Sequence, residues 1–128
     1  MKKLWINLLA VSLMFLAACT SAEKAATISQ DELMARIAYK SVPIILDVRT
    51  AEEFNSGHVP GAIHVPYDDY QNVLQTLSLN NSNELVVYCE KGGRANKVES
   101  YLAEQGFGEV RHLDGDMSGW RKASLPVE

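Results

Sequence analysis

One cysteine stands where an apolar segment meets a glycine-rich, cationic one. In the stretch VVYCEKGGR, residues 86–94, Cys89 ends the apolar run and is followed by Lys91, two glycines and Arg94. A buried structural cysteine has apolar neighbours on both sides, whereas a cysteine beside cationic groups has the surroundings of a reactive thiolate. The stretch leaves four possibilities open: a nucleophile, a metal ligand, half of a disulfide, or a thiol without a role.

The amino terminus has the pattern of an export signal. Two lysines precede an apolar run that ends in small residues. The run from Leu8 to Ala18 is shorter than the ~20 apolar residues that a membrane-spanning helix needs. Leu-Ala-Ala-Cys at 16–19 resembles a bacterial lipobox. We therefore expect residues 1–18 to be a lipoprotein-type signal peptide, Cys19 to carry the lipid and residues 19–26 to form a lipidated tether; an ordinary signal peptide and an uncleaved signal anchor stay open.

Removal of this signal peptide leaves an acidic domain. The formal charge of the chain is -4, and the loss of Lys2 and Lys3 changes it to -6. An acidic domain binds nucleic acid poorly, so we expect no nucleic-acid partner. The expected location is the periplasmic face of a bacterial cell envelope, with attachment to the membrane through the lipid. Thr20 after the lipidated cysteine favours the outer membrane if the cell is an enteric-type bacterium.

Neither a structural disulfide nor a metal site fits this chain. Cys19 and Cys89 are its two cysteines, and lipidation of Cys19 leaves Cys89 without an intrachain partner in an oxidising compartment. The histidines, His58, His64 and His112, show no ligand spacing such as Cys-x-x-Cys or His-x-x-x-His. We therefore expect no metal.

Strand-like and helix-like segments alternate along residues 27–127, which we take as one domain. Apolar, β-branched runs predict strands at 42–48, 62–65, 85–88 and 110–113. Helices are predicted by capping boxes at 29–32 and 50–53 and by apolar stripes at 67–77 and 98–102. This alternation indicates an α/β fold with a parallel sheet and helices on both of its faces.

The order of these segments places Cys89 at the carboxyl end of a buried strand, just before a helix. Ligands of open α/β sheets bind at that edge, and the N–H groups of a glycine-rich turn and a helix N-terminus form an anion-binding cradle. Gly92 and Gly93 permit the tight backbone of such a cradle, and Lys91 and Arg94 add positive charge. We therefore expect Cys89 to be a nucleophile that faces an anion site; a strand-terminal cysteine beside an ordinary turn is the alternative.

Three blocks of the sequence are similar to motifs of the rhodanese family, over nearly all of residues 27–127. The blocks are Asp47-Val48-Arg49 with residues 53–66, which resemble the long first motif, residues 89–94, which resemble the active-site loop, and residues 110–120, which resemble the closing strand, turn and helix. Two positions depart from the pattern. Asp116 stands where a second glycine is usual, and Ala95 stands where serine is common.

This resemblance implies a rhodanese-like three-layer fold, with a five-stranded parallel sheet flanked by helices, and a sulfurtransferase that needs no cofactor. Cys89 would take the outer sulfur of thiosulfate or a similar donor, hold it as a persulfide and pass it to cyanide, a small thiol or a protein thiol. The substrate loop would consist of Glu90, Lys91, Gly92, Gly93 and Arg94. Its N–H groups would stabilise the terminal sulfur, and Lys91 and Arg94 would attract the anionic donor. A monomer is expected.

Other residues of the motifs have supporting roles in this scheme. Asp47 and Arg49 are similar to family positions that brace the active-site loop. His58 is expected to be a hydrogen-bonded turn residue rather than a general base. Arg94 has an alternative role as the ion-pair partner of an acidic residue in the first motif.

Two other functions stay open. A cysteine phosphatase or arsenate reductase would use a loop of the form Cys-x5-Arg, but only four residues separate Cys89 from Arg94. The shorter loop has a smaller ring of N–H donors, which the family associates with sulfur substrates. A rhodanese module without catalytic activity, serving as a persulfide carrier or a redox-sensing protein, is the second alternative. The intact cysteine and the cationic loop favour an active enzyme.

Overall fold

The computed structural model describes residues 24–128. The predicted signal peptide, the predicted lipidation site Cys19 and most of the predicted tether lie outside the described residues. Within the described part, the helices are too short and too polar to cross a membrane.

Strands and helices alternate along the described residues, and the strands form one parallel sheet. The strands are β1 (Ala26–Ile28), β2 (Ile44–Asp47), β3 (Ile63–His64), β4 (Glu84–Tyr88) and β5 (Glu109–Leu113). The helices are α1 (Gln30–Ala38), α2 (Ala51–Asn55), α3 (Tyr70–Thr76), α4 (Gly93–Glu104) and α5 (Asp116–Lys122), and a 3-10 turn, η1 (Tyr67–Asp69), precedes α3. The strand order is β1-β5-β4-β2-β3, so β4 lies at the centre of the sheet.

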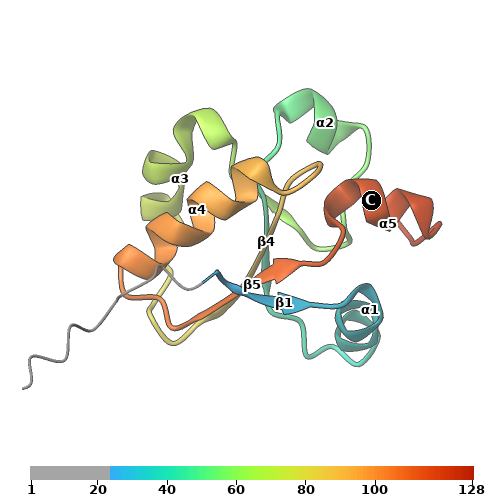
Figure 1. Cartoon of the computed structure of the whole chain (residues 1–128), viewed down its shortest axis with the longest axis horizontal. Helices are drawn as coiled ribbons and strands as arrows, with labels where there is room; N and C mark the ends of the chain where they lie inside the picture. The colour runs from blue at the N-terminus through green and yellow to red at the C-terminus, as the bar shows by residue number, and fades with distance from the viewer. Residues whose placement is uncertain (1–23) are drawn as a thin grey trace, which may run out of the picture.

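Helices cover both faces of this sheet (Figure 1). Side chains of a strand point alternately to its two faces. Ile45 and Val86 pack with α1 and α5, whereas Leu46 and Val87 pack with α3 and α4. Trp120 of α5 is completely buried in the first of these layers. The predicted three-layer α/β fold is therefore confirmed.

Two helices begin where the capping signals predict, but only one capping box is complete. Ser29 accepts a hydrogen bond from the N–H of Glu32 at 3.1 Å, while the carboxylate of Glu32 binds Arg111 of β5 instead of returning to the cap. At α2, Thr50 and Glu53 form both hydrogen bonds of the box. The α1 box is half-formed because a guanidinium competes for its glutamate.

The first strand was missing from the elements predicted by residue pattern. Ala26, the last residue of the predicted tether, is instead the first residue of β1 and pairs with Arg111. A three-residue strand is too short to show a periodic pattern. The helix predicted over 67–77 is also shorter than expected, because η1 occupies its first residues.

Parallel pairing brings three strand ends to one edge of the sheet. Asp47 at the end of β2 is opposite Tyr88 at the end of β4, and Val87 is opposite His112 of β5. The loops that follow these strands therefore lie next to one another. Cys89 begins the central one.

Candidate active site

The sulfur of Cys89 lies against the backbone of the loop between β4 and α4. The N–H of Gly92 donates a hydrogen bond to Sγ at 3.0 Å. Gly92 has a φ of +115°, in the left-handed region that glycine adopts without steric cost, and α4 begins at the next residue. The sulfur is thus close to the positive end of α4. Cys89 is only 2% exposed, so its surroundings are mainly protein.

The first turn of α5 holds the beginning of this loop. The N–H groups of Met117 and Ser118 donate to the carbonyl oxygens of Cys89 and Glu90, at 3.0 and 3.1 Å. The N–H of Cys89 donates in turn to Oδ1 of Asp116 at 3.0 Å. The backbone of the first two loop residues is therefore fixed by the neighbouring helix.

Arg94, the last residue of the loop motif, is bound by a glutamate of α2. Its guanidinium donates to both carboxylate oxygens of Glu53, at 2.8 and 3.2 Å. This pairing lowers the pKa of Glu53 to about 2 and raises the pKa of Arg94, to which the sulfur of Cys89 also contributes. The ion pair expected between Arg94 and an acidic residue of the first motif is therefore present. The attraction of an anionic donor by Arg94 stays a prediction.

Asp47 and Arg49 form a buried ion pair at the end of β2. Their side chains are 0% and 1% exposed, and Nη2 of Arg49 lies 2.7 Å from Oδ2 of Asp47. The hydroxyl of Tyr88 donates to the same carboxylate at 2.6 Å and accepts from the N–H of Val59 at 3.1 Å. Burial lowers the pKa of Arg49, but the hydrogen bonds and charge of Asp47 raise it by more. Arg49 therefore stays charged, and the carboxylate of Asp47 ties β2 to β4 through Tyr88.

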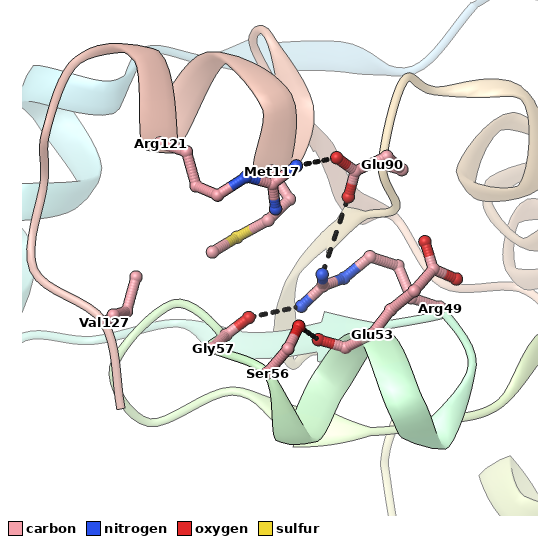
Figure 2. A pocket seen from close by; sticks show the side chains of 8 residues that line it. All are labelled: Arg49, Glu53, Ser56, Gly57, Glu90, Met117, Arg121 and Val127. Carbon is pink, nitrogen blue, oxygen red and sulfur yellow. Dashed lines mark hydrogen bonds and ion pairs between the residues drawn. The ribbon is translucent and has the colours of Figure 1, made fainter.

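Glu90, the residue after the cysteine, lies between two arginines (Figure 2). Its carboxylate forms ion pairs with Arg121 of α5 and, at 3.6 Å, with Nη1 of Arg49. These side chains help to line a cavity of about 480 Å³, and Cys89 is not part of its lining. Arg49 thus contacts the loop at Glu90. The two guanidinium groups also neutralise a carboxylate that would otherwise repel an approaching anion.

The remaining predicted residues have different surroundings. Lys91 is exposed and Gly93 is the first residue of α4. The attraction of a donor by Lys91 stays a prediction. His58 lies outside the loop: its Nδ1 is 3.0 Å from the carbonyl oxygen of Phe54, and its ring stacks on the ring of Phe54. These contacts are those of a turn residue.

Residues 29–123 match the family model of the rhodanese-like domain. The match includes the buried ion pair of Asp47 and Arg49, the whole Cys89 loop and α5. The chain belongs to the rhodanese-like domain family.

Similar proteins with this domain include sulfurtransferases. Thiosulfate sulfurtransferase 16 of Arabidopsis thaliana chloroplasts is 36% identical over 112 residues, which are 80% of this chain and 88% of that protein. The thiosulfate sulfurtransferase GlpE of Shewanella oneidensis is 33% identical over 97 residues, 76% of this chain and 93% of that protein. The crystal structure of the Anabaena protein Alr3790 has a TM-score of 0.72 at 27% identity, over 79% and 81% of the two chains. At the level of the family, this chain is a sulfurtransferase-type rhodanese domain.

The sequence patterns assign no role at the site to three buried charged residues that pack near the Cys89 loop of this rhodanese-like domain. Glu99 of α4, His112 of β5 and Asp116 of α5, here termed the His112 cluster, are at most 8% exposed. Nδ1 of His112 contacts the carboxylate of Glu99, and Nε2 lies 2.9 Å from Oδ2 of Asp116. The only signal in the sequence was Asp116 in place of the usual glycine. Within residues 24–128 no group of such side chains is arranged to hold a metal ion.

Because of the His112 cluster, we expect the folded protein to become less stable in alkaline solution. Hydrogen bonds to Asp116 and Glu99 raise the pKa of His112 from 6.5 to about 10. The folded state binds the proton of His112 more tightly than the unfolded state does. The contribution of protonated His112 to stability is therefore complete below pH ~6.5 and is lost as the pH rises toward ~10. We expect the free energy of unfolding in urea to fall by about 1–4 kcal/mol between pH ~6.5 and ~9.5.

A His112→Gln variant is the control for this effect. It has no proton to lose, so its stability should depend less on pH over the same interval. The pH interval ends below the ordinary pKa of tyrosine, ~10, so ionisation of the buried Tyr88 does not contribute to the change in stability. Equal slopes for the wild-type protein and the variant would show that His112 is not protonated in the folded state.

Proposed function

We propose that this protein is a sulfurtransferase that carries sulfur on Cys89. The thiolate attacks the outer sulfur of thiosulfate or a similar donor and forms a new S–S bond. The old S–S bond breaks, its electron pair leaves with sulfite, and Cys89 becomes a persulfide. An acceptor such as cyanide or a thiolate then attacks the terminal sulfur, and the electron pair of the broken S–S bond returns to Cys89.

The hydrogen bond from Gly92 to Sγ is the observation that carries this proposal. It supports a negatively charged sulfur at Cys89, because an N–H donor stabilises a thiolate more than a thiol. The position at the N-terminus of α4 acts in the same direction. The terminal sulfur of a persulfide is also an anion, and the loop N–H groups would bind it in the same way.

No general base is needed in this mechanism. Both ring nitrogens of His112, the histidine that packs against Gly92, contact carboxylates. The ring is therefore not placed to take a proton from the cysteine. Activation by fixed backbone dipoles and by Arg94 replaces proton transfer, because a thiolate attacks directly.

Mass spectrometry of the Cys89 peptide tests the proposal. After incubation with thiosulfate, the peptide should be heavier by one sulfur atom, and cyanide should remove that atom as thiocyanate. Sulfur loading without release to cyanide or to thiols would favour the persulfide carrier. Hydrolysis of a phosphate ester, with no sulfur loading from thiosulfate, would favour the phosphatase alternative.

An Arg94→Ala variant should lose at least about tenfold in thiosulfate turnover, since a positive charge next to the sulfur is removed. The matched control is Arg36→Ala. Arg36 forms a similar two-bond pair with Glu84, and both pairs have side chains about 30% exposed, but Glu84 is at the opposite end of β4 from Cys89. Urea unfolding should change to a similar extent in both variants. Equal turnover by the two variants at low salt would mean that Arg94 is only structural.

We also propose that the protein is exported and anchored by a lipid on Cys19, which the lipobox-like residues 16–19 support. A Cys19→Ser variant should accumulate as unprocessed precursor, because the lipid must be attached before cleavage. Electrophoresis of the membrane fraction from a bacterial host would reveal the larger form. Cleavage of the variant at the same position would contradict the proposal.

A further inference from the structure

The His112 cluster packs directly against the loop that carries Cys89. A Cβ atom at Gly92 would lie 3.1 Å from Oδ2 of Asp116 and 3.6 Å from Cε1 and Nε2 of His112. The same glycine donates its N–H to the sulfur. The cluster therefore contacts the part of the loop that binds Sγ, and a side chain at residue 92 would push the two apart.

One carboxylate connects the cluster to the nucleophile. Asp116 binds the ring of His112 through Oδ2 at 2.9 Å and the N–H of Cys89 through Oδ1 at 3.0 Å. Asp116 is 4% exposed and has a φ of +53°, where a Cβ atom crowds the backbone. Glycine at residue 116 would adopt this backbone without strain, but it would leave the N–H of Cys89 and Nε2 of His112 without a hydrogen-bond acceptor. The two hydrogen bonds thus offset the strain of an aspartate here.

Glu99 completes the cluster from the other side. Its buried carboxylate contacts Nδ1 of His112, so the ring is held at both nitrogens and its orientation is fixed. The ring faces Glu99 from α4, Asp116 from α5 and Gly92 from the loop. Its positive charge compensates one of the two carboxylates. Without that charge, the carboxylate of Asp116 would disfavour a thiolate at Cys89.

We propose that Glu99, His112 and Asp116 are positioning residues for Cys89. Glu99 orients the ring of His112, the ring orients the carboxylate of Asp116, and this carboxylate fixes the N–H of Cys89, so that Sγ stays within reach of Gly92. The inference rests on sulfur transfer as the proposed function. The cluster nevertheless acts on the sulfur before a donor binds, so its effect is measurable without sulfur transfer.

Three variants of the full chain separate this role from a merely structural one. Asp116→Gly removes the carboxylate and relieves the backbone strain, Asp116→Asn keeps the shape and one acceptor oxygen, and His112→Gln removes the ring charge. The control is Asp114→Asn, which makes the same charge change at an exposed position of the same turn. The measurements are kcat and KM for thiosulfate, and the pH dependence of iodoacetamide alkylation, followed on the Cys89 peptide.

Asp116→Gly should fold and should lose at least about tenfold in kcat, with KM changed by less than about threefold, because sulfur positioning and not donor binding is affected. Asp116→Asn should recover most of kcat, since Oδ1 still accepts from Cys89. The alkylation midpoint should move to higher pH in His112→Gln and to lower pH in Asp116→Asn. Asp114→Asn should match the wild-type protein in every measurement.

Wild-type kcat and a wild-type alkylation profile in Asp116→Gly would overturn the proposal. Alkylation midpoints that move in the same direction in His112→Gln and Asp116→Asn would overturn its electrostatic part. If His112→Gln does not fold, the two Asp116 variants decide the question. If the wild-type protein never accepts sulfur, the proposed function fails, but alkylation of the same variants still tests the cluster, since that reaction needs only the thiolate.

Discussion

A Cys89→Ser variant should fold like the wild-type protein and should lose sulfur transfer by at least about a thousandfold. The Cβ–O bond of serine is shorter than the Cβ–S bond of cysteine by only a fraction of an ångström. The serine oxygen can therefore accept the hydrogen bond from the N–H of Gly92 in place of Sγ. Its hydroxyl does not ionise near neutral pH and forms no persulfide. Initial rates with thiosulfate and cyanide measure the loss.

The loss must be chemical rather than structural for this result to support the mechanism. Urea unfolding of Cys89→Ser should resemble that of the wild-type protein, and the peptide that contains residue 89 should gain no sulfur from thiosulfate. A variant that keeps turnover would mean that another group carries the sulfur, and the proposed mechanism would be wrong.

An Arg49→Met variant should be less stable by about 3–5 kcal/mol, because it leaves the charge of Asp47 buried without a partner. The two side chains are 1% and 0% exposed. Tyr88 still donates to the carboxylate, but a hydroxyl does not replace a cation. Equilibrium unfolding in urea measures the change.

Two further variants show whether the buried charge is the cause. Arg36→Met removes a partly exposed arginine from its glutamate and should cost about 1 kcal/mol or less. The double variant Asp47→Asn, Arg49→Met removes both buried charges and should be more stable than Arg49→Met alone. A loss of less than about 1 kcal/mol in Arg49→Met would show that the site takes up water or a proton, and that the pair matters little to stability.

The alternation of strands and helices, and with it the place of Cys89, was predictable because its signals are local. The apolar run 85–88 predicts a strand buried on both faces, and the structure has β4 there. Thr50 and Glu53 form the predicted capping box because the two residues lie within one helical turn. By contrast, β1 has three residues and is defined by its pairing with β5 at the edge of the sheet. Local patterns do not contain that pairing.

The pairing of charged groups, by contrast, depends on how the chain folds. Glu53 is 41 positions from Arg94, and the sequence does not show whether Glu53 or Asp47, the other acidic residue of the first motif, is the partner. Likewise, the position of His112 in the sequence, far from Cys89, gives no reason to expect it next to Gly92 of the loop. Parallel crossovers bring the carboxyl ends of β2, β4 and β5 to one edge, and the side chains at those ends then pair by distance and burial rather than by order along the chain. Local sequence patterns thus place a cysteine at the end of a strand, whereas the folding of the chain brings together the charged groups that surround it.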